Sequence, residues 1–142
     1  MATWRDLVRY IHIDTRYEIV RESPDEIRIL YRFEEEADVD DDIDGGRTQV
    51  MVLQREVLDH KEDWVQIATP FARVADVDLA TVLEEIALTS VVGGAVIMGE
   101  YLVLRHSVPL QNLDANEFEE PLELVASTAD QLEEQFVGGD NF

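Results

Sequence analysis

The chain of 142 residues contains no cysteine, only one lysine and no long hydrophobic run. Without cysteine the chain cannot form disulfide bonds, thiolate zinc sites or thiol-based catalytic sites. No apolar stretch reaches the roughly 18 residues of a membrane span, and the first residues, MATWRDLVRY, lack the pattern of a secretory leader. These absences predict a soluble, cytoplasmic protein without a membrane segment.

Basic residues are scarce as well. The chain has 11 Lys and Arg against 32 Asp and Glu, a formal net charge of −21. Residues 62–142 carry only Arg73 and Arg105 against sixteen acids, a net of −14. Because nucleic acids and anionic lipids are bound chiefly through Lys and Arg, this charge favours neither as a partner.

The length and the apolar fraction of 46% suffice for one hydrophobic core, and neither a repeat nor a linker divides the chain. We therefore expect a single domain over residues 1–142. Residues 34–44 contain eight acids and are followed by Gly45-Gly46, a composition that predicts a mobile acidic loop at about 34–46. A short flexible tail is expected at 138–142.

The first half of the chain predicts one helix and then an antiparallel meander. Thr3 and Asp6 have the spacing of a capping box, which places a helix near residues 3–14. Strands are expected over 17–22, 26–33, 48–58 and 64–69, with a turn at Ser23-Pro24-Asp25 and the last strand ended by Pro70. The apolar face of this first helix carries Trp4, Leu7, Val8 and Ile11.

The second half predicts a helix, a hairpin and a final helix. The middle helix starts at Asp78, with Leu79, Val82, Leu83 and Ile86 on one face. Gly99-Glu100 joins two strands in a type II′ turn. Asp114 and Glu117 predict a second capping box, and Pro121 predicts a kink or a short separate turn. The last helix has an apolar stripe at 4-3-4-3-4 spacing, expected to pack on the chain's own sheet: Phe118, Leu122, Val125, Ala129, Leu132 and Phe136.

Motifs that carry chemistry are weak or absent. Asp40, Asp42, Asp44 and Gly45 match the start of a calcium loop, but position twelve is Met51 instead of a glutamate. A solvated acidic loop is therefore favoured. The three histidines, at positions 12, 60 and 106, lack metal-ligand spacing, and no nucleophile or phosphate-loop motif occurs. We expect no catalytic residues, no metal and no cofactor.

The stretch Trp64 to Phe142 contains V-x-x-V-D-L-A-T-V-L-E-E-I, a glycine-containing hairpin, Y-L-V-L-R-H-S-V-P-L-x-x-L-D and A-D-Q-L-E-E. It resembles the type III secretion chaperone-like fold, including the bacterial YbjN-domain sensory transduction regulators. The resemblance implies an α+β fold of the order helix–antiparallel meander–helix–hairpin–helix. It also implies a homodimer that holds an extended segment of a client protein through its first helix and sheet.

This resemblance makes Trp4, Leu7, Tyr10 and Ile11 the candidate partner-binding residues, although the residues alone leave core packing open for Trp4 and Tyr10. The leading functional hypothesis is a non-enzymatic protein-binding module, chaperone-like or regulatory. The alternative is an acidic decoy that occupies a basic, nucleic-acid-binding surface of another protein. An enzyme that uses carboxylates alone or a bound divalent metal is the third and least favoured class.

Overall fold

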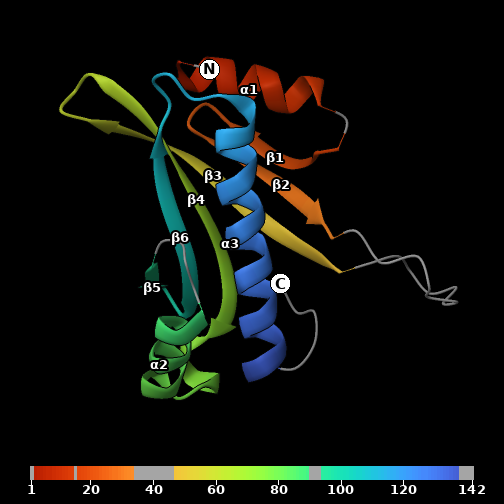
Figure 1. The fold of residues 1–142 in the computed structure, drawn as a ribbon, viewed down its shortest axis with the longest axis vertical. Helices are drawn as coiled ribbons and strands as arrows, with labels where there is room; N and C mark the ends of the chain where they lie inside the picture. Colours follow the sequence, from red (N-terminus) through yellow and green to blue (C-terminus); the bar gives the residue numbers. More distant parts are fainter. Residues whose placement is uncertain (1, 15, 34–46, 90–93, 138–142) are drawn as a thin grey trace, which may run out of the picture.

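The computed structural model describes residues 2–14, 16–33, 47–89 and 94–137. They form a mixed α+β domain with three α-helices and six strands, in the predicted order (Figure 1). The predicted acidic loop, its calcium-loop pattern and the tail lie outside the described residues. The elements are α1 (Trp4–Ile13), β1 (Glu18–Ser23), β2 (Glu26–Arg32), β3 (Thr48–Leu58), β4 (Glu62–Arg73), a 3₁₀ turn (Val74–Asp76), α2 (Leu79–Thr89), β5 (Gly94–Met98), β6 (Tyr101–Pro109) and α3 (Ala115–Phe136).

The six strands form one antiparallel sheet of order β1-β2-β3-β4-β6-β5. The predicted meander and hairpin are therefore confirmed, and β6 joins the hairpin to β4. Cross-strand neighbours such as Ile29 and Met51, or Leu53 and Ile67, are buried on the face that the helices cover. The described chain places no helix over the opposite face, where Leu30, Val50 and Val52 stay partly exposed.

The helix α3 lies along the middle of the sheet, chiefly over β4 (Figure 1). Five residues of its predicted apolar stripe, Phe118 to Leu132, are buried in the core, and Phe136 packs against them at the edge. The predicted intramolecular packing is thus confirmed. Pro121 lies inside the helix, which continues through it to Phe136.

The two predicted capping boxes have different outcomes. At α1, the Thr3 hydroxyl accepts from the Asp6 amide and the Asp6 carboxylate accepts from the Thr3 amide, as predicted. At α3, Asp114 has extended N-cap geometry but its side chain makes no capping hydrogen bond, so the second prediction is wrong. Spacing alone does not decide this because the side chain must also adopt the rotamer that reaches the backbone.

The prediction that Pro70 ends its strand is also wrong. The strand β4 continues to Arg73, and the register against β6 shifts between Pro70 and Ala72. A bulge tolerates the missing proline N–H. The buried Gln49 amide also donates to the Pro70 carbonyl and to the Thr69 hydroxyl, both at 2.9 Å, which ties β3 to β4 at this point.

The helix α1 is fixed to the sheet by its first residue. The Trp4 backbone N–H donates to Asp63 at 3.0 Å, and its indole N–H donates to the Pro24 carbonyl at 3.0 Å. Asp63, on β4, also pairs with Arg55 on β3. Its carboxylate therefore accepts a free backbone N–H at the N-terminus of α1, where the helix dipole is positive. No helix of the described chain is long and apolar enough to cross a membrane.

We predict that Leu122→Ala lowers the free energy of unfolding by about 2–5 kcal/mol, because Leu122 is 1% exposed and its removal leaves a cavity between α3 and the sheet. Leu124→Ala is the matched control. This leucine is 39% exposed on the same helix, and its loss costs less than about 1 kcal/mol. Urea unfolding of both variants measures the difference, and equal losses would contradict the packing described.

Candidate functional site

A groove of about 730 Å³ lies between α3 and the sheet edge formed by β1 and β2. Its lining comes from three places in the sequence: the connection between α1 and β1, the end of β2, and one side of α3. We call it the aromatic groove. Its lining residues are Arg16, Tyr17, Glu18, Tyr31, Arg32, Phe33, Glu119, Glu123 and Ser127.

Three half-buried aromatic side chains give the groove its apolar surface: Tyr17, Tyr31 and Phe33. Tyr31 and Phe33 continue the inward-facing side of β2 beyond Ile29, by the two-residue period of a strand. Their rings meet edge to face, with centroids 5.2 Å apart. The core therefore extends here as an aromatic surface that α3 only partly covers.

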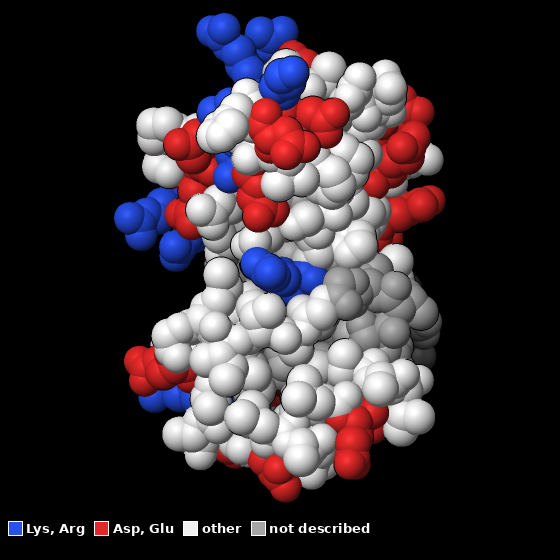
Figure 2. Space-filling view, turned by 90° about the vertical axis from the view of Figure 1, so that its left-hand side faces the viewer, with Lys and Arg blue, Asp and Glu red and all other residues white. Residues whose placement is uncertain are grey.

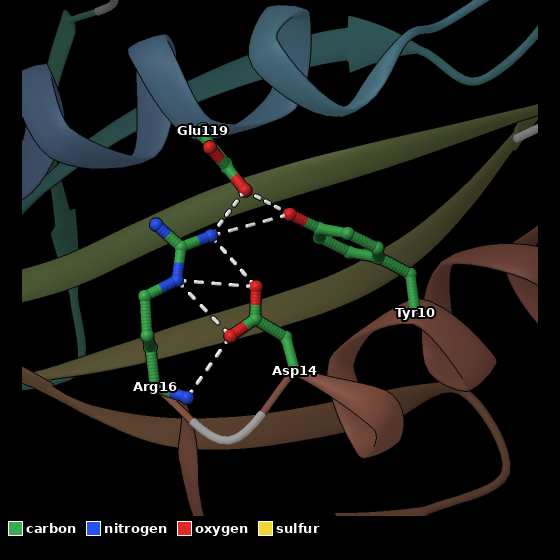
Figure 3. A network of polar contacts seen from close by, with 4 residues as sticks. All are labelled: Tyr10, Asp14, Arg16 and Glu119. Atoms are coloured by element: carbon green, nitrogen blue, oxygen red, sulfur yellow. Dashed lines mark hydrogen bonds and ion pairs between the residues drawn. The ribbon is translucent and has the colours of Figure 1, made fainter.

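A polar network closes one end of the groove (Figure 3). The Arg16 guanidinium contacts Asp14 at 2.6 Å and Glu119 at 2.5 Å, and the Tyr10 hydroxyl donates to the same Glu119 oxygen. Arg16 also lies over the Tyr17 ring, 5.6 Å from its centroid. The network joins α1, the α1–β1 connection and α3, so it sets the distance between the two sides of the groove.

One side of α3 forms an acidic wall, next to its apolar stripe. Residues of this wall recur at helical spacing: Glu119, Glu123, Ser127, Asp130 and Glu134. The two ends of the wall are paired, with Glu119 held by Arg16 and with Asp130 and Glu134 held by Arg47. Between them, Glu123 is exposed and forms no ion pair with any described residue.

The opposite rim is nearly charge-balanced. Arg32 from β2 pairs with Glu18 from β1 at 2.8 Å, and both side chains remain more than half exposed. Such an exposed pair contributes little stability and can exchange partners readily. The groove thus combines a neutral rim, an aromatic surface and a wall with one unpaired carboxylate.

Two pKa shifts reflect this environment. Hydrogen bonds from the Arg16 side chain lower the pKa of Asp14, which keeps this carboxylate ionised. Burial raises the pKa of Tyr17 to about 12, although Arg16 acts in the opposite direction. At neutral pH the Tyr17 phenol is therefore neutral and the Asp14 carboxylate is charged, which keeps the Arg16–Asp14 ion pair intact at the end of the groove.

The four candidate partner-binding residues differ in how far they are buried. Trp4, Leu7 and Ile11 are at most 6% exposed and belong to the chain's own core, so they present no surface while α1 is docked. Tyr10 is partly buried, and its hydroxyl joins the network at the end of the aromatic groove. Of the four, Tyr10 alone lies at the groove.

Sequence reasoning missed Arg16, Tyr17, Glu119 and Glu123. A signal was present in α3, where polar residues at positions 119, 123, 127, 130 and 134 each follow one of the first five members of the apolar stripe by one or two residues. A polar row so regularly adjacent to a buried stripe lies at the margin of the core. The histidines are not in the groove, and His12 contacts Glu22 at 2.9 Å on the surface. The described residues contain no group of three or more side chains that could hold a metal ion.

A second exposed surface lies at the other edge of the sheet. It comprises Leu83 and Leu88 of α2 and Ile97 and Met98 of β5, which are 52%, 81%, 56% and 43% exposed; we call it the β5 edge. Leu83 was expected on the buried face of its helix but lies at its margin, whereas Val82 is fully buried. Figure 2 looks onto this side, and its lower half shows few charged side chains, acidic and basic, which lie mainly at its margins.

The two outer strands of the sheet differ in protection. β1 carries Glu18, Arg21 and Glu22 and has an irregular register between Ile19 and Arg21, features that discourage further pairing. β5 has the uncharged sequence GAVIM and pairs with β6 in regular register. Gly99 has a φ of 62° in the predicted two-residue turn, so Met98 and Tyr101, which flank the turn, form a hydrogen-bonded pair. Hydrogen-bonded and non-hydrogen-bonded pairs alternate along an antiparallel hairpin, so the backbone groups of Ala95 and Ile97 point away from β6.

The chain matches no protein-family model, and a search of curated proteins finds none with significant sequence similarity to it.

We predict that Tyr17 lowers the stability of the protein at alkaline pH. Its pKa is about 12 in the folded state and about 10 when unfolded, so the unfolded state releases the proton first as pH rises. Stability is therefore unaffected below pH 10 and falls between pH 10 and about 12. Tyr17→Phe removes this contribution, and urea unfolding across this range shows a shallower decline than in the original chain. Identical declines would contradict a buried, neutral phenol.

Proposed function

We propose that the protein is a non-enzymatic protein-binding module that holds an extended segment of a partner in the aromatic groove. The observation that carries the proposal is the groove itself, with Tyr17, Tyr31 and Phe33 left partly uncovered beside an acidic helix wall. A groove of about 730 Å³ exceeds the volume of one side chain and suits several residues of a chain.

The order of elements supports the chaperone-like part of this proposal. A first helix, an antiparallel meander, a second helix, a hairpin and a last helix occur in the sequence expected from the resemblance. In such a module the partner is bound in an extended form, because aromatic pockets and backbone groups recognise a chain that exposes both its side chains and its peptides. The role is chaperone-like or regulatory, in the cytoplasm.

We further propose that the β5 edge joins two copies of the chain into a homodimer. With a two-fold axis beside β5, this strand pairs with β5 of a second copy, so that Ala95 and Ile97 face the same two residues of that copy. The outward backbone N–H and C=O groups of both strands then form hydrogen bonds with each other. The exposed leucines of α2 lie at the same end of the molecule as β5 (Figure 1) and enlarge the apolar contact. Figure 2 shows few charged side chains on this surface, which limits the repulsion between two chains of net charge −21 that meet there.

An acidic decoy for a basic protein surface is the rival function. The solvent side of α3 favours it, since Glu117 and Glu120 are exposed there and residues 115–136 contain no Lys or Arg. Binding of that kind depends on charge over a wide surface and collapses as salt rises, because screening shortens the Debye length to about 8 Å at physiological ionic strength. Binding in a partly apolar groove survives the same change.

A selection from random, unstructured peptides tests the groove as a protein-binding site. We expect enriched peptides to bind the original chain at moderate salt and to lose at least about 10-fold in affinity with Ser127→Trp, whose side chain fills the groove from α3. Val20→Asp, at an exposed residue of β1 that does not line the groove, is the control substitution, and urea unfolding verifies both variants. No enrichment, or enrichment that ignores Ser127→Trp, overturns the proposal, and binding lost at moderate salt supports the decoy.

Light scattering at micromolar concentration tests the homodimer. With a subunit of 16.2 kDa, we expect twice that mass at both low and moderate salt. Ile97→Asp places a charge on the β5 edge and yields the monomer. Val20→Asp is the matched control, because Val20 is 52% exposed on the other outer strand and its replacement leaves the dimer intact. A monomeric original chain, or a dimer that persists in Ile97→Asp, rules out this interface.

A further inference from the structure

We propose that the aromatic groove recognises an arginine side chain of the partner segment, which stacks on Tyr31 and Phe33 and pairs with Glu123. The inference rests on the proposed function and names the chemistry of its ligand. Three features of the described residues carry it: an unpaired carboxylate, an aromatic surface in the same groove, and the way the chain places its own arginines.

Glu123 is the first of these features. The carboxylates on either side of it along α3 are held by arginines of the chain itself, Glu119 by Arg16 and Asp130 by Arg47. Glu123 lines the groove between these two pairs, four residues after Glu119, and forms no ion pair with any described residue. The two arginines that line the groove, Arg16 and Arg32, already pair with Glu119 and Glu18. A guest cation entering here therefore pairs with Glu123 and completes the row of carboxylate–arginine pairs.

The aromatic surface is the second feature. Tyr31 and Phe33 present a half-buried, edge-to-face pair directly in the groove. A cation within about 6 Å of such a ring face is attracted by the ring quadrupole, and the attraction grows as water is excluded. A purely apolar guest covers these rings equally well but leaves the Glu123 carboxylate beside it partly desolvated and unpaired, which is costly.

The third feature is the way in which the chain binds its own arginines. Arg16 lies 5.6 Å from the centroid of Tyr17 and binds Asp14 and Glu119 at the same time. Arg73 likewise lies over the ring of Tyr101, at 5.9 Å. In the groove, Tyr31 and Glu123 offer a guest the combination of ring and carboxylate that Tyr17 and Glu119 offer Arg16. Arginine fits this combination better than lysine, because its planar, weakly hydrated guanidinium stacks on rings and pairs with carboxylates simultaneously.

Defined peptides test this assignment. The probes are capped alanine pentapeptides with arginine, citrulline, lysine or leucine at the centre, together with agmatine as a free cation. Citrulline keeps the planar shape of arginine but has no charge. We expect the arginine peptide to shift the ring resonances of Tyr31 and Phe33 in NMR titrations, and the citrulline peptide to bind about 10-fold more weakly. Agmatine also binds more weakly than the peptide, because it lacks the flanking residues.

Two variants of α3 separate the groove from general charge. Glu123→Gln removes the unpaired carboxylate and is expected to weaken the arginine peptide about 10-fold. Glu120→Gln makes the same change in net charge on an exposed residue outside the groove, and its effect stays below about 2-fold. Both glutamates have exposed side chains, so neither replacement disturbs the core.

Equal affinity for the arginine and citrulline peptides overturns the proposal, as do equal effects of Glu123→Gln and Glu120→Gln. Preference for the leucine peptide overturns the arginine assignment while the protein-binding function stands. Equal affinity for agmatine and the peptide shows a site for small cations instead of a protein segment. If none of the probes binds but the random selection still yields ligands whose binding Ser127→Trp abolishes, the arginine assignment is wrong and the proposed protein-binding function stands. If both experiments fail, the proposed function falls as well.

Discussion

A single long helix must cover a six-stranded sheet that is wider than the helix, and the remaining features of this molecule follow from this difference in width. Six strands span about 24 Å at a spacing of about 4.8 Å, whereas a helix with its side chains is about 10 Å wide. α3 lies over β4, near the middle of the sheet, and its apolar stripe buries the centre. The outer strands depend on α1 and α2, which are shorter and sit towards the two ends of α3 (Figure 1). What these helices leave uncovered is the aromatic groove on one side and the β5 edge on the other.

The uneven charge of the sequence has a structural use. Nine of the eleven basic residues lie in residues 1–61, and the helix α3 has none. Arg16 and Arg47 reach across more than eighty residues of sequence to carboxylates of α3. These pairs join the N-terminal half of the chain to the last helix and fix the width of the groove between them. Each is partly exposed, so its contribution to stability is small; its main effect is to set the position and orientation of α3.

The periodicity of the sequence was sufficient to predict most elements but not the site. The apolar stripe from Phe118 to Phe136 and the alternation around Ile27 and Ile29 identify buried faces, because burial demands that spacing. Pro70 and Asp114 were misjudged because a bulge and a side-chain rotamer decide their roles, and neither leaves a spacing signal. Trp4, Leu7 and Ile11 form an apolar face whose pattern is the same whether it meets a partner or the chain's own sheet. The groove forms because residues far apart in the sequence meet, such as Arg16 and Glu119, which are 103 positions apart. Which distant residues meet is decided by tertiary packing and leaves no local pattern in the sequence.

The two proposed surfaces lie at opposite edges of one sheet, so they can be occupied at the same time. The groove uses β1, β2 and one side of α3, whereas the β5 edge uses the strand farthest from them in the sheet order. A dimer joined through β5 therefore places its two grooves at the far ends of a continuous sheet, where neither partner segment blocks the interface. A protein that carries two arginine-bearing segments, connected by a linker able to span both grooves, gains affinity through effective concentration without any new contact. Self-association then increases the affinity and selectivity of a site that binds each single segment weakly.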